Sequence, residues 1–350
     1  MLEKVYKAFG VPGDPEEAVA FGSGLINHTW KISKNGKFYV LQRINQQVFR
    51  EPDAIAFNIN LTARFLGERY PEYLFVTPER SVDQQDIYHD EESGYFRLSP
   101  FVENSHTIDV VAETGQAYEA ARQFGLFTKL LGEMDATRLK ITLPDFHNLS
   151  LRYEQFGNAL RDGNRQRIGE SAPLIEAIIA RKGIVDTFVA IRNNAAFKIR
   201  ATHHDTKISN VLFDDRDKGL CVIDLDTLMP GYFISDFGDM MRTYLSPVSE
   251  EEKDFSKICI RDGFFEAIVD GYIGELKDEL SQEEKAHAVY AGKFMIYMQA
   301  IRFLTDHLNN DSYYGAKYTG HNLLRAANQL ELLARLEEKE EILEKIAARF

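Results

Sequence analysis

Polar residues between positions 202 and 226 combine side chains that could act together on a hydroxyl group. A carboxylate at Asp205 can orient a hydroxyl and accept its proton, and the ammonium of Lys207 can offset the charge of phosphate oxygens. The amide of Asn210 and the carboxylate of Asp224 supply hard oxygen ligands of the kind that Mg²⁺ prefers. These residue types suit phosphoryl transfer to an alcohol.

A hairpin is predicted to bring the two metal-ligand candidates together. Apolar runs at 210–213 and 220–225 flank the polar stretch 214–219, which is typical of two strands joined by a turn. Asn210 and Asp224 stand at opposite ends of this unit, and the two ends of a hairpin lie side by side. Asp226, two residues beyond Asp224, is expected to assist in holding the metal.

The first hundred residues are predicted to form strands with one helix. Runs at 29–32 and 37–44 flank Asn35-Gly36, which is the strongest short hairpin signal. A second strand pair is expected at 86–89 and 95–98. Pro52 opens a helix predicted over 52–66, where apolar residues recur at helical spacing.

Long helices are predicted beyond Pro100, at 114–134, 281–308 and 322–350, and Ser281 with Glu284 forms a capping-box pattern. We therefore expect an α+β fold. A small β-rich lobe, residues 1–100, would precede a larger helical lobe, residues 101–350, that carries the catalytic hairpin. The cleft between the lobes is the expected ligand site.

Composition excludes several classes of protein. Among 350 residues, 41 Lys and Arg stand against 54 Asp and Glu, and the net charge of −13 argues against nucleic acid or an anionic membrane as partner. Two isolated cysteines, Cys221 and Cys259, fit neither a disulfide framework nor a zinc ribbon. With no apolar leader and no apolar run of about 18 residues, we expect a cytoplasmic protein without a membrane span.

Two motifs resemble the catalytic loop and the metal-binding segment of the kinase-like fold, namely His204-Asp205 followed by Asn210, and Ile223-Asp224 followed by Asp226. Their form is similar to the aminoglycoside phosphotransferase and choline kinase superfamily, and within it to N-acetylhexosamine 1-kinases. The stretches that carry this resemblance are Phe21–Asn27, Tyr39–Asn45, Glu103–Thr107, His204–Lys207, Ile223–Gly231, Asp236–Asp239 and Arg302–Asp306.

The resemblance implies a protein kinase-like two-lobed fold and a kinase that uses ATP and Mg²⁺ to phosphorylate the anomeric hydroxyl of an N-acetylhexosamine such as GlcNAc or GalNAc. Asp205 and Lys207 would be catalytic, and Asn210, Asp224 and Asp226 would hold Mg²⁺. The expected partners are ATP and a small sugar acceptor. Two other interpretations stay open: a choline or aminoglycoside kinase on the same fold, and a non-catalytic nucleotide-binding regulator.

The literal Asp-Phe-Gly motif of protein kinases occurs at Asp236-Phe237-Gly238, 26 residues beyond Asn210. This separation is too long for the usual hairpin, and Asp224 occupies the expected place, so we expect Asp236 to brace the catalytic loop by hydrogen bonds. His204 is expected to brace the same loop, and His203 to line the acceptor pocket. Adjacent side chains point apart, so the two histidines are not expected to share a metal ion.

The nucleotide side of the site is less well defined. Gly22-Ser23-Gly24 precedes the first strand and could lay backbone N–H groups over phosphates, although Asn27 stands where a third glycine would complete the motif. Arg43 takes the place of the phosphate-binding basic residue of the resembling kinases. Phe57 stands where a glutamate is expected on the following helix, so that Glu51 or Glu68 pairs with Arg43 instead, or the pair is absent.

Three further residues are expected at the acceptor. The resemblance implies that Arg302 holds the sugar, that Tyr313 makes another contact, and that Tyr244 is a stacking wall. Alternatively, Arg302 forms an ion pair with Asp306 one turn further along its helix.

Overall fold

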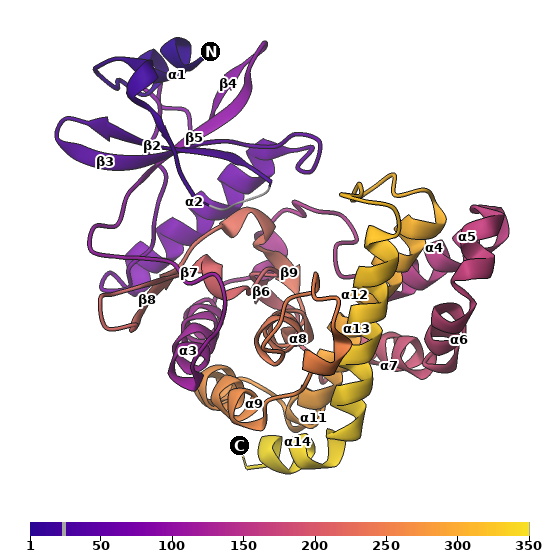
Figure 1. Ribbon diagram of the computed structural model, residues 1–350. Coiled ribbons are helices and arrows are strands. Elements are labelled where there is room, and N and C mark those ends of the chain that lie inside the picture. Colours follow the sequence, from indigo (N-terminus) through magenta and orange to yellow (C-terminus); the bar gives the residue numbers. More distant parts are fainter. Residues whose placement is uncertain (23–25, 350) are drawn as a thin grey trace.

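The computed structural model describes residues 1–22 and 26–349, which form an N-terminal sheet region joined to a larger helical region (Figure 1). The sheet is antiparallel, with strand order β1-β2-β3-β5-β4. Its strands are β1 Val19–Ala20, β2 His28–Lys34, β3 Lys37–Arg43, β4 Tyr88–Asp90 and β5 Gly94–Pro100. This architecture confirms the α+β, kinase-like fold.

The predicted hairpin around Asn35-Gly36 is confirmed. Both residues have positive φ, 54° and 78°, and Lys34 pairs with Lys37 across the turn. Two consecutive left-handed residues give a turn whose twist matches that of the flanking strands, and Asn-Gly is the pair that adopts it at least cost.

The two faces of the sheet are covered by different helices. On one face, Leu41, Phe96 and Leu98 pack with residues of α1, Leu2–Ala8, in a small apolar cluster. The other face looks toward α2, Pro52–Arg69, and the helical region (Figure 1). Because side chains alternate along a strand, each residue of β3 and β5 belongs to one of these faces only.

The helical region is built around α12, Ala288–Leu308, most of which is buried between neighbouring helices. A helix that is apolar on nearly all sides belongs at the centre of a core. The other helices are α3 Thr114–Leu130, α4 Leu149–Asp162, α5 Arg165–Glu170, α6 Ala172–Ala180, α7 Gly183–Arg192, α8 Phe233–Tyr244, α9 Asp262–Ile268, α10 Gly274–Leu276, α11 Gln282–Ala286, α13 His321–Glu338 and α14 Glu340–Ala347.

The helix predicted from Ser281 to Leu308 is divided in two. The capping box of Ser281 and Glu284 is present, but α11 ends before His287, where the backbone leaves the helical conformation (φ −100°, ψ 16°), and α12 starts after it. Glu284 is fully buried and also forms an ion pair with Arg200 at 2.6 Å. The short first segment is thereby fixed to β6, Arg200–Thr202.

Two small hairpin-like units position the functional segments. Strand β6 pairs with β9, Met229–Gly231, and β7, Val211–Phe213, pairs with β8, Gly219–Val222, as the sequence predicted for the second pair. Strand β8 packs on α3 and β6 on α8 and α3, and both units lie below the sheet (Figure 1). Among the residues that the structure describes, no helix combines the length and apolarity needed to cross a membrane.

Candidate active site

The catalytic loop is fixed by the carboxylate of Asp236, which lies near the start of α8 and is fully buried. Its oxygens accept the backbone N–H groups of His203 at 3.0 Å and His204 at 2.7 Å. His204 has a φ of 67°, a conformation that is costly for a side chain of this size unless neighbouring bonds hold it. Asp236 therefore braces the loop, as the spacing argument predicted.

Both histidines of the loop are buried in a hydrogen-bonded frame. The Nε2 of His203 lies 2.9 Å from the carbonyl of Ile223, and the Nδ1 of His204 lies 3.0 Å from the carbonyl of Thr202. Burial lowers the pKa of His203 and lowers that of His204 to about 4, so both rings are neutral at pH 7. The expectation that His203 lines the acceptor pocket is wrong, because its side chain is enclosed between the catalytic loop and the metal-binding segment.

Asp205 is half-buried at the end of this frame, and one of its oxygens is occupied. Its Oδ2 accepts a hydrogen bond from the side-chain nitrogen of Asn210 at 3.0 Å and lies 3.2 Å from the Nζ of Lys207. Within the described chain, the hydrogen bonds to this carboxylate all use Oδ2, so Oδ1 is available to a hydroxyl proton. Burial lowers the pKa of Lys207, but the charges of Asp205 and Asp239 outweigh it, and the net shift is upward.

The hairpin β7–β8 brings Asn210 next to Asp224, as predicted. The N–H of Ile223 donates to the carbonyl of Asn210 at 2.9 Å. Asp224 is the next residue after Ile223, so its backbone lies close to that of Asn210. The amide nitrogen of Asn210 is used by Asp205, which leaves its oxygen as the atom suited to a cation.

Asp224 sits in a left-handed conformation, with φ 59° and ψ 61°, and its side chain reaches solvent. Desolvation by the surrounding protein, followed by the negative charges of Asp226 and Asp205, raises the pKa of Asp224 to about 7. The side chain reaches solvent, so a cation could approach it. Such a cation would relieve the part of the pKa shift that comes from repulsion between the carboxylates.

Asp226 has a different role from the one expected. Its Oδ1 is held by the guanidinium of Arg97 from β5, and its Oδ2 accepts a hydrogen bond from the side chain of Asn27 at 2.7 Å. Both partners come from the sheet region, and the Arg97–Asp226 pair is buried, with side-chain exposures of 7% and 3%. The prediction that Asp226 assists at the metal is therefore corrected, since in this structure its two oxygens join the sheet region to the metal-binding segment.

Arg43 does not face this part of the molecule. In β3, Leu41 and Arg43 share a face, and Leu41 belongs to the apolar cluster under α1. The opposite face carries Gln42, whose side-chain oxygen accepts a bond from the Nε of Arg97 at 2.9 Å. The prediction for Arg43 is therefore wrong by one residue: Gln42, not Arg43, is on the face of β3 that meets Arg97. A shift of one residue along a strand moves the side chain to the other face of the sheet.

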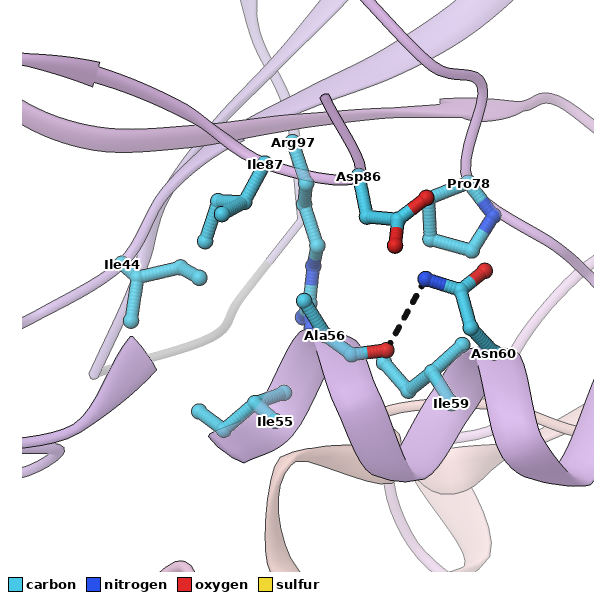
Figure 2. Close-up of a pocket in the computed structure, with 9 residues that line it drawn as sticks. All are labelled: Ile44, Ile55, Ala56, Ile59, Asn60, Pro78, Asp86, Ile87 and Arg97. Atoms are coloured by element: carbon cyan, nitrogen blue, oxygen red, sulfur yellow. Dashed lines mark hydrogen bonds between the residues drawn. The ribbon is translucent and has the colours of Figure 1, made fainter. Parts of the chain in front are cut away.

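A small cavity lies between the sheet and α2, and the side chain of Arg97 passes through it (Figure 2). Its volume is about 10 Å³, room for about one water molecule, so it does not hold a substrate. Ile44, Ile55 and Ile87 line the cavity and shield the aliphatic part of Arg97 (Figure 2). The apolar surroundings strengthen the attraction between Arg97 and Asp226, and they also make an unpaired charge costly there.

The other nucleotide-side predictions have mixed outcomes. Gly22 has a φ of 82°, a conformation that favours glycine, whereas Ser23 and Gly24 lie outside the described residues. Phe57 is exposed on α2 and carries the ammonium of Lys140 over its ring at 4.6 Å. The next residue, Asn58, is fully buried and donates to the carbonyl of Leu228, so α2 is attached to the metal-binding segment by an amide.

A larger pocket of about 390 Å³ is lined by α4, the end of α12 and the loop that follows it. Arg302 and Tyr313, which the sequence assigned to the acceptor, both line it. The alternative pairing of Arg302 with Asp306 is not seen, because Asp306 accepts the N–H groups of Tyr313 at 2.7 Å and Tyr314 at 2.9 Å and so holds the loop. Arg302 instead lies over the rings of Phe146 and Tyr314, at 5.7 and 5.4 Å.

This pocket is connected to the catalytic loop through His147. The His147 ring stacks on Phe146 and lies 5.3 Å from the ring of His204, centre to centre. Burial, the nearby His204, and then the positive charges of Arg302 and Arg242 lower the pKa of His147 well below its usual value. A chain of ring contacts, from Arg302 over Phe146 to His147 and then His204, thus links the pocket wall to the catalytic loop.

Tyr244 is not a wall of this pocket. It is fully buried at the end of α8, and its hydroxyl donates to the carbonyl of Thr206 at 2.7 Å. This bond supports the catalytic loop from below, so the predicted stacking role of Tyr244 is corrected.

Two contributors were missed in the sequence. Arg97 is the charged member of the run Tyr95-Phe96-Arg97-Leu98, and a charge inside an apolar strand signals a buried partner. Arg152 lines the acceptor pocket from α4, a region in which no site residue was predicted.

Comparison with known proteins adds a family and a set of structural neighbours. The profile of the phosphotransferase enzyme family matches residues 17–275 of this chain. Among solved structures, an amicoumacin kinase in complex with AMP-PNP, Ca²⁺ and a compound abbreviated Ami is 14% identical, with a TM-score of 0.65 over 95% of this chain and 92% of the other.

Two further structures have similar folds. A microcompartment-associated aminopropanol kinase is 14% identical, with a TM-score of 0.62 over 98% of each chain. A choline/ethanolamine kinase family protein from Mesorhizobium loti is 16% identical, with a TM-score of 0.53 over 99% of each chain. At these identities the likeness concerns the fold.

Proposed function

The chain belongs to the phosphotransferase enzyme family, and we propose that it is an ATP- and Mg²⁺-dependent kinase that phosphorylates the anomeric hydroxyl of an N-acetylhexosamine. The observation that carries this proposal is the arrangement of Asp205 beside the Asn210–Asp224 pair. One carboxylate oxygen is held by Asn210 and Lys207 while the other is available, and the two oxygen ligands stand side by side on a fixed hairpin.

The donor set fits Mg²⁺. This ion is held in phosphoryl-transfer enzymes by one or two protein carboxylates together with substrate phosphates. The Asn210 oxygen and the Asp224 carboxylate supply such a pair, and a cation would offset the repulsion of Asp226 and Asp205, which adds to desolvation in raising the pKa of Asp224.

In this proposal Asp205 acts on the acceptor. Its Oδ1 accepts the hydroxyl proton, the hydroxyl oxygen forms a bond to the γ-phosphorus of ATP, and the bond from that phosphorus to the bridging oxygen of ADP breaks. Lys207 offsets charge on the transferred group, and the bound Mg²⁺ neutralises phosphate charge. The frame of His203, His204 and Asp236 keeps Asp205 in position, so that little reorganisation is required during transfer.

The acceptor pocket favours an uncharged or anionic acceptor over a cationic one. Arg302 and Arg152 both line it, and Asp306 is already bonded to backbone N–H groups, which leaves the exposed Asp162 as the acidic group of the described lining that could meet an ammonium group. Tyr313 is 74% exposed at the rim, where it could cover a bound sugar.

The test is a turnover assay with ATP, Mg²⁺ and parallel acceptors: GlcNAc, GalNAc, free hexoses, choline and an aminoglycoside. Acid-labile phosphate on an N-acetylhexosamine supports the proposal. Turnover only on choline or the aminoglycoside keeps a kinase but rejects the sugar, and ATP binding without any turnover favours a regulatory protein.

A further inference from the structure

The acceptor pocket contains a second guanidinium that the proposed function does not use. Arg152, in the first turn of α4, lines the pocket together with Arg302. One of its terminal nitrogens donates to the side chain of Gln155 at 3.0 Å and the other to the carbonyl of Asp145 at 2.8 Å. These bonds hold the planar group in a defined orientation.

The positive charge of this pair is not neutralised by a carboxylate in contact. Neither Arg152 nor Arg302 takes part in an ion pair with another described residue, and the partners of Arg302 are Gln299 and two aromatic rings. Burial, and then the charge of Arg302, lowers the pKa of Arg152, which shows that the two groups repel each other. The carboxylates of Asp162 and Asp306 line the same pocket but pair with neither guanidinium group, so both groups can attract a ligand oxygen.

Two polar atoms of the pocket wall are also left without a partner. The Nε of Arg152 and the hydroxyl of Thr305 are buried and make no hydrogen bond to any residue that the structure describes. Buried polar atoms are normally satisfied, and both of these belong to residues that line the pocket, although the atoms themselves are closed off from solvent and need a side-chain shift to meet a ligand.

On the premise of the proposed function, we propose that Arg152 and Arg302 together bind an acyl or carboxylate oxygen of the acceptor, and that Arg152 discriminates against acceptors that carry an ammonium group. The ligand class is a hydroxyl compound with a carbonyl-type oxygen, either the amide of an N-acetyl group or a carboxylate. Thr305 contributes a hydroxyl to the same oxygen or to its neighbour.

The test compares four sugars of one ring size: N-acetylglucosamine with an amide, N-acetylmuramic acid with an amide and a carboxylate, glucose with neither, and glucosamine with an ammonium group. The variant is Arg152→Met, which keeps the length of the side chain. Arg192→Met, at the exposed end of α7, is the matched control. We expect Arg152→Met to raise KM for the amide-bearing sugars by about tenfold to a hundredfold, with kcat within about threefold, because a charge-assisted hydrogen bond is lost.

The ratio of kcat/KM between N-acetylglucosamine and glucosamine should fall by at least about tenfold in Arg152→Met and stay unchanged in Arg192→Met. Greater loss with N-acetylmuramic acid than with N-acetylglucosamine assigns the carboxylate as the bound group, and equal loss assigns the amide. Unchanged ratios, or an equal loss for all four sugars, would overturn the proposal.

Binding without ATP separates this inference from the proposed function. Saturation-transfer NMR on the wild-type protein should show contact with the N-acetyl methyl group, and the signal should be lost in Arg152→Met and weakened in Thr305→Val. If the sugars bind in this way but are not phosphorylated, the proposed function fails and the pocket assignment stands. No binding of the N-acetyl sugars to the wild-type protein overturns the pocket assignment. If Arg152→Met fails to fold, Arg152→Lys, which keeps the charge, takes its place, with an intermediate loss expected.

Discussion

Arg97 and Asp226, separated by 129 positions in the sequence, form a buried ion pair that joins the N-terminal sheet to the metal-binding segment. The pair is extended on one side by Gln42, which accepts from Arg97, and on the other by Asn27, which donates to Asp226. Through these contacts the sheet region influences the position of Asp224, two residues away.

A double-mutant cycle tests the strength of this connection. Arg97→Met leaves the Asp226 carboxylate buried without its cation, and Asp226→Asn leaves the guanidinium without its anion, so each variant should lose about 3–5 kcal/mol of unfolding free energy. The double variant should lose clearly less unfolding free energy than the two single variants lose together. Urea denaturation measures all four proteins, and losses that add within about 0.5 kcal/mol would contradict the pairing.

Arg43 provides a test of the register of β3. Because it shares a face with Leu41, on the side of α1, Arg43→Ala should leave the KM for ATP within about threefold of the wild-type value. Arg97→Met should raise the same KM by about tenfold or more, since Asp226, two residues from Asp224, loses its partner and Asp224 loses a nearby positive charge. Initial-rate kinetics at saturating acceptor separate the two variants, and a larger effect at Arg43 would show that this side chain faces the nucleotide.

Asp224 is expected to lower the stability of the metal-free protein while it supports metal binding. Its carboxylate lies close to those of Asp226 and Asp205, so Asp224→Asn should raise the melting temperature in the absence of Mg²⁺ by relieving repulsion. The same variant should lose Mg²⁺-dependent phosphoryl transfer by at least about a thousandfold. Differential scanning fluorimetry with and without Mg²⁺ and ATP provides the measurement. A variant that melts lower without Mg²⁺ and keeps its activity would exclude Asp224 as a metal ligand.

Asp236 should give the protein a recognisable pH dependence. Burial raises its pKa in the folded state to about 7, above the ordinary value of 3.8, so the folded form binds a proton more tightly than the unfolded form. Its contribution to stability is full below about pH 4 and is lost as the pH rises through about 7. Asp236→Asn removes this titration. Between about pH 4 and pH 7 the unfolding free energy of the wild type should therefore fall relative to that of the variant. A difference in unfolding free energy that does not change with pH would contradict the raised pKa of Asp236.

The catalytic segment was predictable because its signals are local. The polar turn between two apolar runs defined the β7–β8 hairpin, and the hairpin alone brings Asn210 beside Asp224. The bracing role of Asp236 followed from a separation too long for a second hairpin. In each case the spacing within one short stretch determined the arrangement.

The errors have a different origin, because they concern long-range packing. The sequence does not show that the residues on one face of β3 meet an N-terminal helix, and this assignment decides between Gln42 and Arg43. It also does not show that the side chains of Tyr244 and His203 are fully buried behind the catalytic loop. Polar side chains in apolar surroundings are ambiguous in sequence, since a buried hydrogen bond and a ligand contact require the same residue types.

The most direct test of the central claim concerns Asp205. Single-turnover measurement with ATP, Mg²⁺ and an N-acetylhexosamine, compared between wild type and Asp205→Asn, isolates the chemical step, and calorimetry reports ATP affinity separately. The account predicts that the variant binds ATP within about threefold of the wild-type affinity and that its phosphoryl-transfer rate falls by about a hundredfold or more. A transfer rate within about threefold of the wild-type value, with the same sugar 1-phosphate formed, would show that Asp205 is not the residue that receives the acceptor proton.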